Sequence, residues 1–176
     1  KKNIESLHAN DVVYSRNDIT GKLELDTVYI NYERLTMENI YEISTENGVI
    51  KVTPTHPFFV KNKGYTQVKK LKVGDILIDA FNNEVKILDI KIKVNYSGVK
   101  VYNLQVTNNH NYYVGNDNVL VHNKGGSTGG GGGGNSGGSS SGGSSSCFIA
   151  GTKVLTPDGK KNIESLHAND VVYSRN

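Results

Sequence analysis

Hydrophobic and polar residues alternate along several short segments of the chain. In residues 22–30, Leu23, Leu25 and Tyr29 share one face, and residues 99–107 alternate in the same way. Successive side chains of a strand point to opposite faces of a sheet, so this pattern predicts half-buried β-strands. Short strands of this kind, repeated along the chain with turn residues between them, predict an all-β fold.

Local signals between these strands predict how they are connected. Asn47–Gly48 separates two strand-like runs, which predicts a β-hairpin. Residues 84–94 alternate but change phase midway, which predicts a bulge or a bend. Residues 34–41 are the segment that hints at a helical turn.

The sequence also contains a weak internal echo. Residues 3–15 align with residues 67–79, sharing a leucine, an aspartate and three apolar positions. One interpretation is a pseudo-two-fold relation between two halves of a single β-fold. The other is a pair of unrelated loop-to-strand transitions.

Residues 124–146 interrupt the alternating pattern because they consist mostly of glycine and serine. Such a segment has no side chains that could build a core, and as a flexible coil it spans about 24–29 Å. We interpret it as an engineered joint that closes two chain ends lying near each other.

Residues 1–17 recur identically at residues 160–176. An identity of this length indicates a circularly permuted or tandem sequence that is cut with an overlap. Only one copy can occupy the single slot in the fold, and the sequence does not decide which. The spare copy is expected to hang free or to pair with a neighbouring molecule as a swapped element, giving self-association.

The permutation divides the chain into three parts. Residues 1–123 are the main part of the domain, residues 124–146 are the linker, and residues 147–176 are the N-terminal part moved to the C-terminus. In the natural order, residues 147–159 precede residues 1–123, or equivalently residues 147–176 precede residue 18 onward.

Composition and charge exclude several classes of partner. The net charge is +3 with basic and acidic residues mixed along the chain, whereas a nucleic-acid-binding protein usually shows a basic patch interleaved with aromatic residues. No apolar run approaches the roughly 18–20 residues that span a bilayer, and the first residues lack the apolar core of a signal peptide. We expect neither a nucleic-acid nor a membrane partner, and the compartment stays unassigned.

The single cysteine, Cys147, excludes a disulfide within the chain. The five histidines include the duplicated pair His8 and His167, and no histidine or cysteine spacing matches a zinc pattern. The sequence therefore predicts no metal and no cofactor.

Cys147 follows Ser146, whose carbonyl its thiol can attack, exchanging the amide for a thioester. This attack needs thiolate character, donors for the developing oxyanion and a proton for the departing amine. Thr53 and His56 can supply the last two, because the prolines beside them make their loop rigid.

Asn123 offers a second reaction. Its side-chain amide can attack its own backbone carbonyl, which closes a succinimide and releases the amine of Lys124. The leaving amine needs a general acid, and His122 is adjacent in the sequence. His110 is a second imidazole that can polarise the same carbonyl.

Four stretches resemble the motifs of the intein and Hint (hedgehog–intein) family, and they occur in family order once the natural order is restored. They are CFIAGTKVLT from residue 147, VTPTHPFFV from residue 52, VYNLQVTNNHNYYV from residue 101 and VLVHN from residue 119. The chain is also similar to bacterial intein-like domains and to the Hint modules of secreted bacterial toxins.

This resemblance implies a horseshoe-shaped, all-β fold with pseudo-two-fold symmetry, in which both ends of the domain meet at one active site. It assigns Cys147 as the N-terminal nucleophile, with its scissile bond activated by Thr53 and His56. The residues that it assigns to cleavage of the C-terminal bond are His110, His122 and Asn123.

Two departures from the family pattern bear on mechanism. Asn103 stands where many members carry aspartate, which puts a proton shuttle there in question. Lys124 stands where splicing inteins carry Cys, Ser or Thr, and lysine has no thiol or hydroxyl for transesterification. We therefore predict single-turnover cleavage of the chain's own flanking segments, favoured over standard splicing.

Two alternatives stay open. One is a largely inactive intein scaffold, engineered for the study of permutation, oligomerisation or domain swapping. The other is a Cys-His-Asn hydrolase that acts on other proteins, although such enzymes usually present the cysteine at a helix start, and no helix is predicted there.

Overall fold

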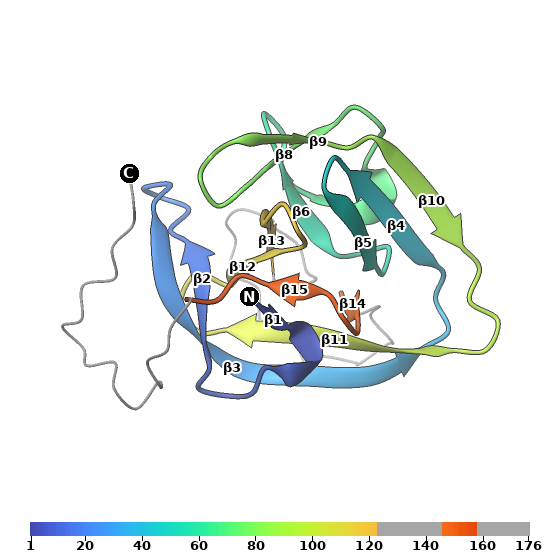
Figure 1. The fold of residues 1–176 in the computed structure, drawn as a ribbon, viewed down its shortest axis with the longest axis horizontal. Coiled ribbons are helices and arrows are strands. Elements are labelled where there is room, and N and C mark those ends of the chain that lie inside the picture. The colour runs from blue at the N-terminus through green and yellow to red at the C-terminus, as the bar shows by residue number, and fades with distance from the viewer. Residues whose placement is uncertain (123–145, 158–176) are drawn as a thin grey trace, which may run out of the picture.

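The computed structural model describes residues 1–122 and 146–157, and these residues form strands joined by turns (Figure 1). Two short 3-10 helices, η1 (Ile4–Ser6) and η2 (Val68–Lys70), are the helical elements of the described part. The predicted all-β fold is confirmed. The predictions that concern Asn123, the linker and residues 160–176 lie outside the described residues.

The first of two sheets has eight strands. They are β1 (Lys2–Asn3), β6 (Pro57–Val60), β7 (Gly64–Gln67), β8 (Ile76–Ile78), β9 (Glu84–Lys86), β12 (Asn111–Val114), β13 (Val119–His122) and β15 (Lys153–Val154). Their order across the sheet is β1-β15-β12-β13-β6-β8-β9, with β7 paired to β6. Neighbouring strands are antiparallel.

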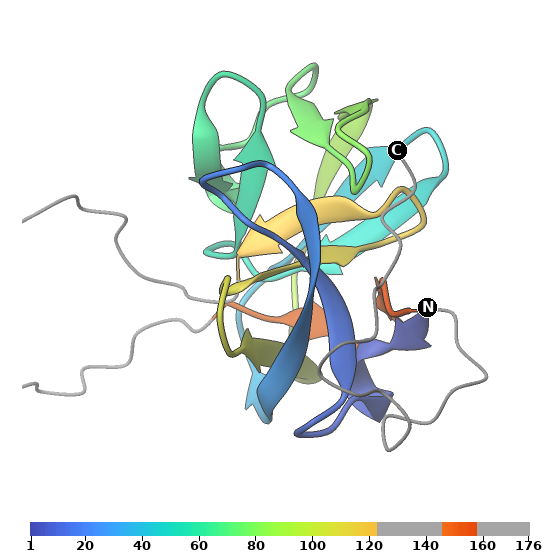
Figure 2. The ribbon, with the colours of Figure 1, turned by 90° about the vertical axis from the view of Figure 1, so that its left-hand side faces the viewer.

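The second sheet has seven strands, also antiparallel. They are β2 (Val12–Arg16), β3 (Leu23–Thr36), β4 (Ile40–Thr45), β5 (Gly48–Val52), β10 (Asp89–Lys93), β11 (Val99–Val106) and β14 (Phe148–Ile149). Their order is β10-β4-β5-β14-β11-β3-β2. The long strand β3 sweeps along β11, and the two sheets curl around a shared interior (Figures 1 and 2). This curled arrangement is the horseshoe that the resemblance implied.

The segment from residue 146 to residue 157 completes both sheets although it lies far from its partners in the sequence. In the second sheet, Phe148 of β14 pairs with Val52 of β5 on one side and with Tyr102 of β11 on the other. In the first sheet, β15 lies between β1 and β12. The segment that carries Cys147 is therefore an integral part of the fold.

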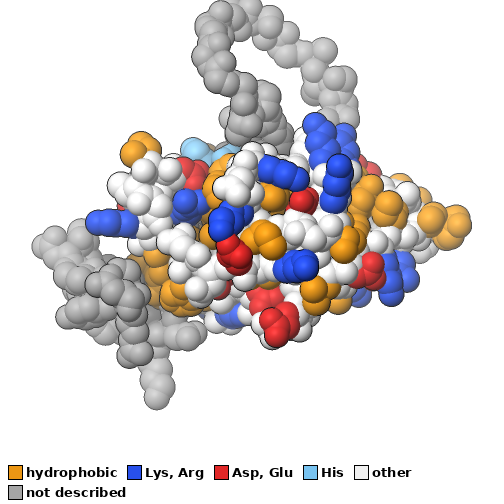
Figure 3. Space-filling view, turned by 90° about the horizontal axis from the view of Figure 1, so that it is seen from above, with side chains coloured by type: hydrophobic (Ala, Val, Ile, Leu, Met, Phe, Trp, Pro, Cys, Tyr) orange, Lys and Arg blue, Asp and Glu red, His pale blue; other side chains and the backbone are white. Residues whose placement is uncertain are grey.

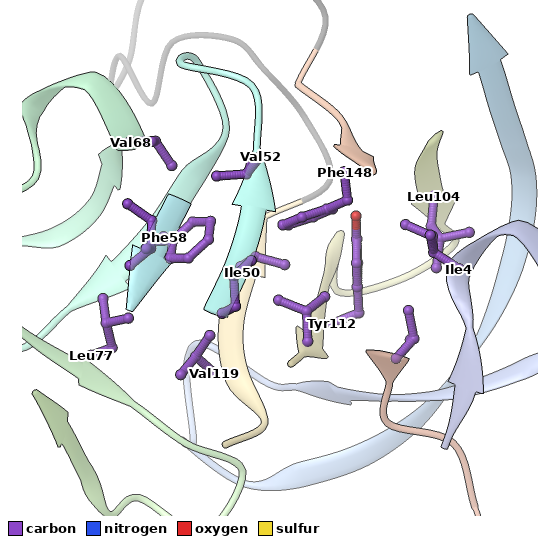
Figure 4. Packing of buried hydrophobic residues seen from close by; sticks show 14 of the residues in the cluster. Ile4, Ile50, Val52, Phe58, Val68, Leu77, Leu104, Tyr112, Val119 and Phe148 are labelled. Atoms are coloured by element: carbon purple, nitrogen blue, oxygen red, sulfur yellow. The ribbon is translucent and has the colours of Figure 1, made fainter. Parts of the chain in front are cut away.

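Aromatic rings fill the interior between the sheets (Figure 4). Phe148 lies between Phe58 and Tyr112, with ring centroids 6.1 Å and 6.3 Å apart, respectively. All three side chains are buried. Full burial of a side chain of this size contributes roughly 1.5–3 kcal/mol, so Phe148 ties the C-terminal segment to the core.

The internal echo corresponds to a repeated backbone path. Both 3-10 helices follow a strand, and each is followed by a turn in which an aspartate carboxylate accepts a backbone N–H: His8 to Asp11 at 2.8 Å, and Lys72 to Asp75 at 2.9 Å. The backbone carbonyl of each aspartate accepts an N–H from later in the chain. Val28 donates to Asp11 at 2.8 Å, and Ile87 donates to Asp75 at 2.9 Å. The pseudo-two-fold interpretation is confirmed, and the chance interpretation is wrong.

The N-terminal copy of the repeated 17-residue segment lies in the fold as β1, η1 and β2. Lys2 and Asn3 pair with the two residues of β15. The Lys1 ammonium also donates to the carbonyl oxygens of Gly115 and Asn116, at 3.2 Å and 2.9 Å. The slot that the sequence left open is thus filled by residues 1–17 in this structure.

The predicted hairpin is confirmed, but its turn is shifted by one residue. Thr45 pairs with Gly48, so Glu46 and Asn47 form the turn and Gly48 opens β5. A Cβ atom on Gly48 would lie 2.7 Å from the Asn116 side-chain nitrogen. Close approach, rather than turn conformation, is the reason for glycine at this position.

The predicted bend is confirmed, and the predicted helical turn is wrong. The chain leaves the first sheet after β9 and enters the second at β10, with the buried Ile87 between them. Residues 34–41 contain the end of β3, a bend and the start of β4 instead of a helix. Arg34 pairs with Val101 and Thr36 with Val99 on β11, so strand pairing overrides the local preference.

Candidate functional site

Cys147 is held by a reciprocal pair of hydrogen bonds to Thr53. Its backbone N–H donates to Thr53 Oγ1 at 2.8 Å, and its carbonyl oxygen accepts the Thr53 backbone N–H at 2.9 Å. Cys147 is 1% exposed and Thr53 is completely buried. The nitrogen of the Ser146–Cys147 bond therefore faces a fixed hydroxyl in a site closed to water.

His56 lies beside both candidate junctions. Burial and the charge of His122 lower the pKa of His56 to about 3. Interactions with the backbones of Ser146 and His122 favour the protonated ring, but their effect on the pKa is smaller. The imidazole is therefore neutral at pH 7. Ser146 itself is buried, and its hydroxyl donates to the Thr55 carbonyl at 3.1 Å.

Aromatic rings surround the His56 imidazole and account for its low pKa. The Phe148 ring centroid lies 4.2 Å away, and the rings of Phe58 and Tyr112 approach edge-on at 6.1 Å and 6.4 Å. Neither ring nitrogen makes a hydrogen bond of ordinary geometry with a described residue. A buried polar group without such a partner is costly, and a buried imidazole with a strongly lowered pKa is a candidate functional residue.

The thiol of Cys147 lies beside a cation that sequence reasoning missed. Cys147 packs against Ile40 and Val101, and Val101 is the cross-strand partner of Arg34. Partial burial opposes the charge on Arg34, but hydrogen bonds to Cys147 and to Glu38 raise the pKa of Arg34 above its ordinary value. A guanidinium beside a thiol favours the thiolate, which is the nucleophilic form.

Glu38 fixes the guanidinium of Arg34 in place. The two side chains form an ion pair at 3.1 Å, and the Glu38 carboxylate also accepts the Thr36 hydroxyl at 3.2 Å. The Glu38 backbone N–H donates back to the same hydroxyl at 3.2 Å. These residues lie in the segment for which a helical turn was predicted, and only its pairing with β11 brings Arg34 to the cysteine.

The two histidines assigned to the C-terminal junction are more exposed to solvent. His122, the last residue of β13, is half-buried and opposes Asn111 on β12. The exposed His110 lies 6.5 Å from His122, measured between ring centroids. The ring of Tyr65 packs edge-on against His122 at 4.9 Å. Asn123, which follows His122, lies outside the described residues.

Tyr65 is itself fixed by Asp18, in the turn between β2 and β3. Its hydroxyl lies 3.2 Å from both carboxylate oxygens of Asp18. Burial and the nearby Asp18 charge raise the pKa of Tyr65, so it remains a neutral phenol that donates to the carboxylate. The contact with Asp18 thereby fixes the Tyr65 ring in its position against His122.

Asn103, the position at which aspartate was noted in many relatives, is buried on β11. The Tyr112 hydroxyl lies 3.4 Å from its side-chain oxygen. Burial and the charge of Cys147 raise the pKa of Tyr112, which shows that Tyr112 lies close to the thiol. A carboxamide has no titrating proton, so Asn103 supplies hydrogen-bonding groups near the cysteine but no acid.

The predicted site residues that the structure describes are gathered around His56. Thr53 binds Cys147, His56 interacts with the backbone of Ser146 and with His122, and His110 lies next to His122. In the sequence these residues belong to four separate stretches. The fold brings the Ser146–Cys147 bond and His122, the last described residue before the second candidate junction, close to the same imidazole.

The described part of the chain shows neither a metal-binding group of side chains nor a membrane-spanning helix. Among residues 1–122 and 146–157, no three His, Cys, Asp or Glu side chains lie together in a group that could hold a metal ion. Within the same ranges, no helix is long and apolar enough to cross a membrane. Charged side chains of both signs are interspersed on the face seen in Figure 3.

Comparison with solved structures defines the class of protein. The chain is 38% identical to the bacterial intein-like domain from Clostridium thermocellum, covering 68% of this chain and 86% of that one with a TM-score of 0.65. A DnaB intein from Synechocystis (23% identity, 69% and 87% covered, TM-score 0.57) and the gp41-1 intein (24%, 68% and 85%, 0.54) share the fold. The chain thus has the intein fold, and these relatives support intein-like autoprocessing as its general activity.

The family match is more specific than the fold. The pretoxin HINT domain family matches residues 1–124. The chain therefore belongs to the pretoxin HINT domain family. The search of curated proteins gave no match.

Proposed function

We propose that the chain cleaves itself at two peptide bonds, Ser146–Cys147 and Asn123–Lys124, and that cleavage is favoured over standard splicing. The observation that carries this proposal is the contact between Cys147 and Thr53. The backbone N–H of Cys147, which belongs to the bond to be broken, donates to a buried hydroxyl at 2.8 Å. The neutral imidazole of His56 lies beside the backbone of Ser146, on the other side of the same bond.

At the first bond, the Cys147 thiolate attacks the Ser146 carbonyl carbon. A C–S bond forms, the C–N bond breaks, and the nitrogen of Cys147 leaves as an amine that takes up the proton that the thiol gave up when it became a thiolate. Thr53 holds that nitrogen, and His56 can donate a hydrogen bond to the developing oxyanion as a neutral group. Arg34 favours the thiolate before the attack.

At the second bond, the side-chain nitrogen of Asn123 attacks its own carbonyl carbon. The new C–N bond closes a succinimide, the bond to Lys124 breaks, and the released amine takes up a proton. His122 and His110 are the imidazoles available to supply it, at a junction that is more open to water than the first. Imidazole is the side chain most often used as a general acid near neutral pH.

Lys124 determines the products of these two reactions. Splicing transfers the thioester to a hydroxyl or thiol after the asparagine, and lysine has neither. The thioester then goes to water, which releases residues 124–146 as a linear peptide, or to the freed α-amine of Lys124, which closes the same residues into a ring. The two products differ in mass by one water.

Intact-mass measurement of the purified chain, with and without added thiol, tests the proposal. Loss of residues 124–146 is the expected result, and added thiol should accelerate release at Cys147 by exchange with the thioester. An unchanged mass under both conditions would overturn the proposed activity and leave the fold unaffected.

A second candidate is a scaffold in which the two copies of the 17-residue segment exchange, within one chain or between two. It is favoured by the pairing of Lys2 and Asn3 with β15, because residues 160–176 follow β15 closely in the sequence and could form the same pairs through a short turn. Size-exclusion chromatography at several concentrations tests this candidate. Elution should shift with concentration for the full chain and not for a chain lacking residues 160–176.

A further inference from the structure

Asp26 is a buried acidic residue in the middle of a strand. It is 3% exposed and lies on β3, among alternating residues whose apolar members drew attention in the sequence. Those apolar residues are not the buried ones, because Tyr29 is exposed while Asp26 and Val28 face the interior. A buried carboxylate needs several donors to offset the loss of water, so its partners show what it holds.

The partners of Asp26 come from the loop between β11 and β12. Its carboxylate accepts the Thr107 hydroxyl at 2.6 Å, the backbone N–H of Asn108 at 3.0 Å and the backbone N–H of Asn109 at 2.8 Å. The Asn108 side-chain amide donates at 3.1 Å, and the Thr27 backbone N–H donates at 2.8 Å. One carboxylate thus fixes three consecutive residues of this loop.

The same loop is fixed from a second side. The side-chain amide of Asn109 donates to Ser15 Oγ at 2.8 Å and to Glu24 Oε2 at 2.9 Å. Beyond the loop, Asn111 exchanges two hydrogen bonds with the backbone of Arg16, at 2.7 Å and 2.9 Å. The residues on both sides of position 110 are therefore held by β2 and β3.

His110 occupies the one position left between these anchors. Its φ is 56°, in the left-handed region that residues other than glycine seldom adopt. Such a conformation persists when the surrounding structure imposes it, and it is found preferentially at functional sites. Here it accompanies a ring centroid 6.5 Å from that of His122.

We propose that Asp26 is a positioning residue for cleavage at the C-terminal bond, acting through His110. The proposal rests on the proposed function, since it concerns the same reaction. Asp26 does not touch the reacting atoms. Its role requires a carboxylate, because both oxygens accept hydrogen bonds from the loop, and an asparagine would turn an NH₂ group toward one of those donors.

The test is Asp26→Asn in the full chain, with cleavage at both bonds followed by mass in one sample. Cleavage after Asn123 should slow by on the order of 10- to 100-fold, the effect of a small displacement of a reacting group. Thiol-induced cleavage before Cys147 should stay within about twofold of the parent, since the Thr53 contacts are untouched. Equal slowing at both bonds, or no slowing after Asn123, overturns the proposal.

Asp75→Asn is the matched control. Its carboxylate also accepts a backbone N–H and holds a turn, but in the other half of the pseudo-two-fold and away from His110. Both cleavage rates should stay at the parent level in this variant. A C-terminal rate that falls as far as in Asp26→Asn would mean that general loss of stability explains the effect, and would overturn the positioning role.

A spectroscopic readout separates this proposal from the proposed function. In an NMR spectrum of the histidine side chains, Asp26→Asn should move the His110 resonances and leave those of His56 in place. This measurement needs no cleavage, so it tests Asp26 even if the parent chain proves inactive. Unchanged His110 resonances in the variant would overturn the positioning role.

Discussion

The described residues assigned to the two candidate junctions lie close together but differ in their contact with water. Around Cys147, Thr53 and His56 the site is closed, and aromatic rings surround an imidazole held neutral by burial. At the other junction His110 is exposed and His122 is half-buried. A closed site strengthens the few polar contacts that act on a thiolate and an oxyanion, because the local dielectric is low.

The open junction suits a different step. Loss of an amine requires a proton, and a histidine in contact with water can take one up from solvent and deliver it. His56 cannot fill that role at neutral pH, since its pKa is about 3. The comparison therefore assigns stabilisation of the thiolate and the oxyanion away from water to the closed junction, and proton uptake from solvent to the histidines of the open one.

The largest expected effect is complete loss of one reaction with retention of the other. Cys147→Ala removes the sulfur nucleophile, so thiol-induced cleavage before residue 147 should disappear while cleavage after Asn123 continues. Asn123→Ala should give the reverse result, because alanine cannot close a succinimide. Mass spectrometry of both variants checks the pair, and loss of both cleavages in either single variant would contradict two separately built junctions.

Thr53→Val tests the hydrogen bond at the closed junction. Valine keeps the shape of threonine but cannot accept the Cys147 N–H. Misplacement of a reacting group after the loss of one such contact slows a step by on the order of 10²-fold. Cleavage before Cys147 should slow by that order, and cleavage after Asn123 should change little.

Thr66→Val is the matched control for that experiment. Thr66 lies on β7, and its hydroxyl donates to the nearby Gly64 carbonyl rather than to a residue of either junction. Both cleavage rates should match those of the parent. If Thr53→Val behaves like Thr66→Val, the contact with Cys147 has no role in the reaction.

Arg34→Gln should have a smaller effect on the same junction. Loss of the guanidinium makes the thiolate less favourable, so thiol-induced cleavage should slow by about tenfold at pH 7 and recover at higher pH. Lys100→Gln is the control, because Lys100 forms an ion pair with Glu33 on the same sheet at 3.0 Å. The measurement is the pH profile of cleavage in each variant. An unshifted profile in Arg34→Gln would exclude a role of the guanidinium in forming the thiolate.

Much of the fold and part of the site could be predicted from local patterns. Alternation identified β11, the phase change in residues 84–94 identified the crossing between sheets, and the internal echo identified the two halves. The first two signals each lie within a dozen or so consecutive residues, and the third compares two such segments. The proline-bracketed loop of Thr53 and His56 was likewise visible because its rigidity is a local property.

Arg34 and Asp26 could not be predicted in this way because their roles depend on distant partners. Asp26 binds Thr107, which is 81 positions away in the sequence. In an alternating strand it resembled a solvent-facing residue. Arg34 reaches Cys147 only because β3 and β14 both pair with β11. A polar residue at an inward position of an alternating strand is the signal that could have indicated either one.

The smallest expected effect concerns stability rather than rate. Unfolded His56 has a pKa near 6.5, while in the folded chain burial lowers it to about 3. The unfolded state therefore binds more protons between these values, so stability falls as pH falls from above 6.5 toward 3. From pH 7 to pH 6 this group alone should cost about 0.7 kcal/mol.

Urea unfolding at the two pH values, compared among three chains, isolates the contribution of His56. His56→Gln has no imidazole to protonate, so it should lose about 0.7 kcal/mol less than the parent between pH 7 and pH 6, whatever its absolute stability. His110→Gln keeps His56, so the loss of about 0.7 kcal/mol that His56 causes should remain in this variant. If His110→Gln were the variant that removed the pH dependence, the assignment of the closed and open junctions would have to be reversed.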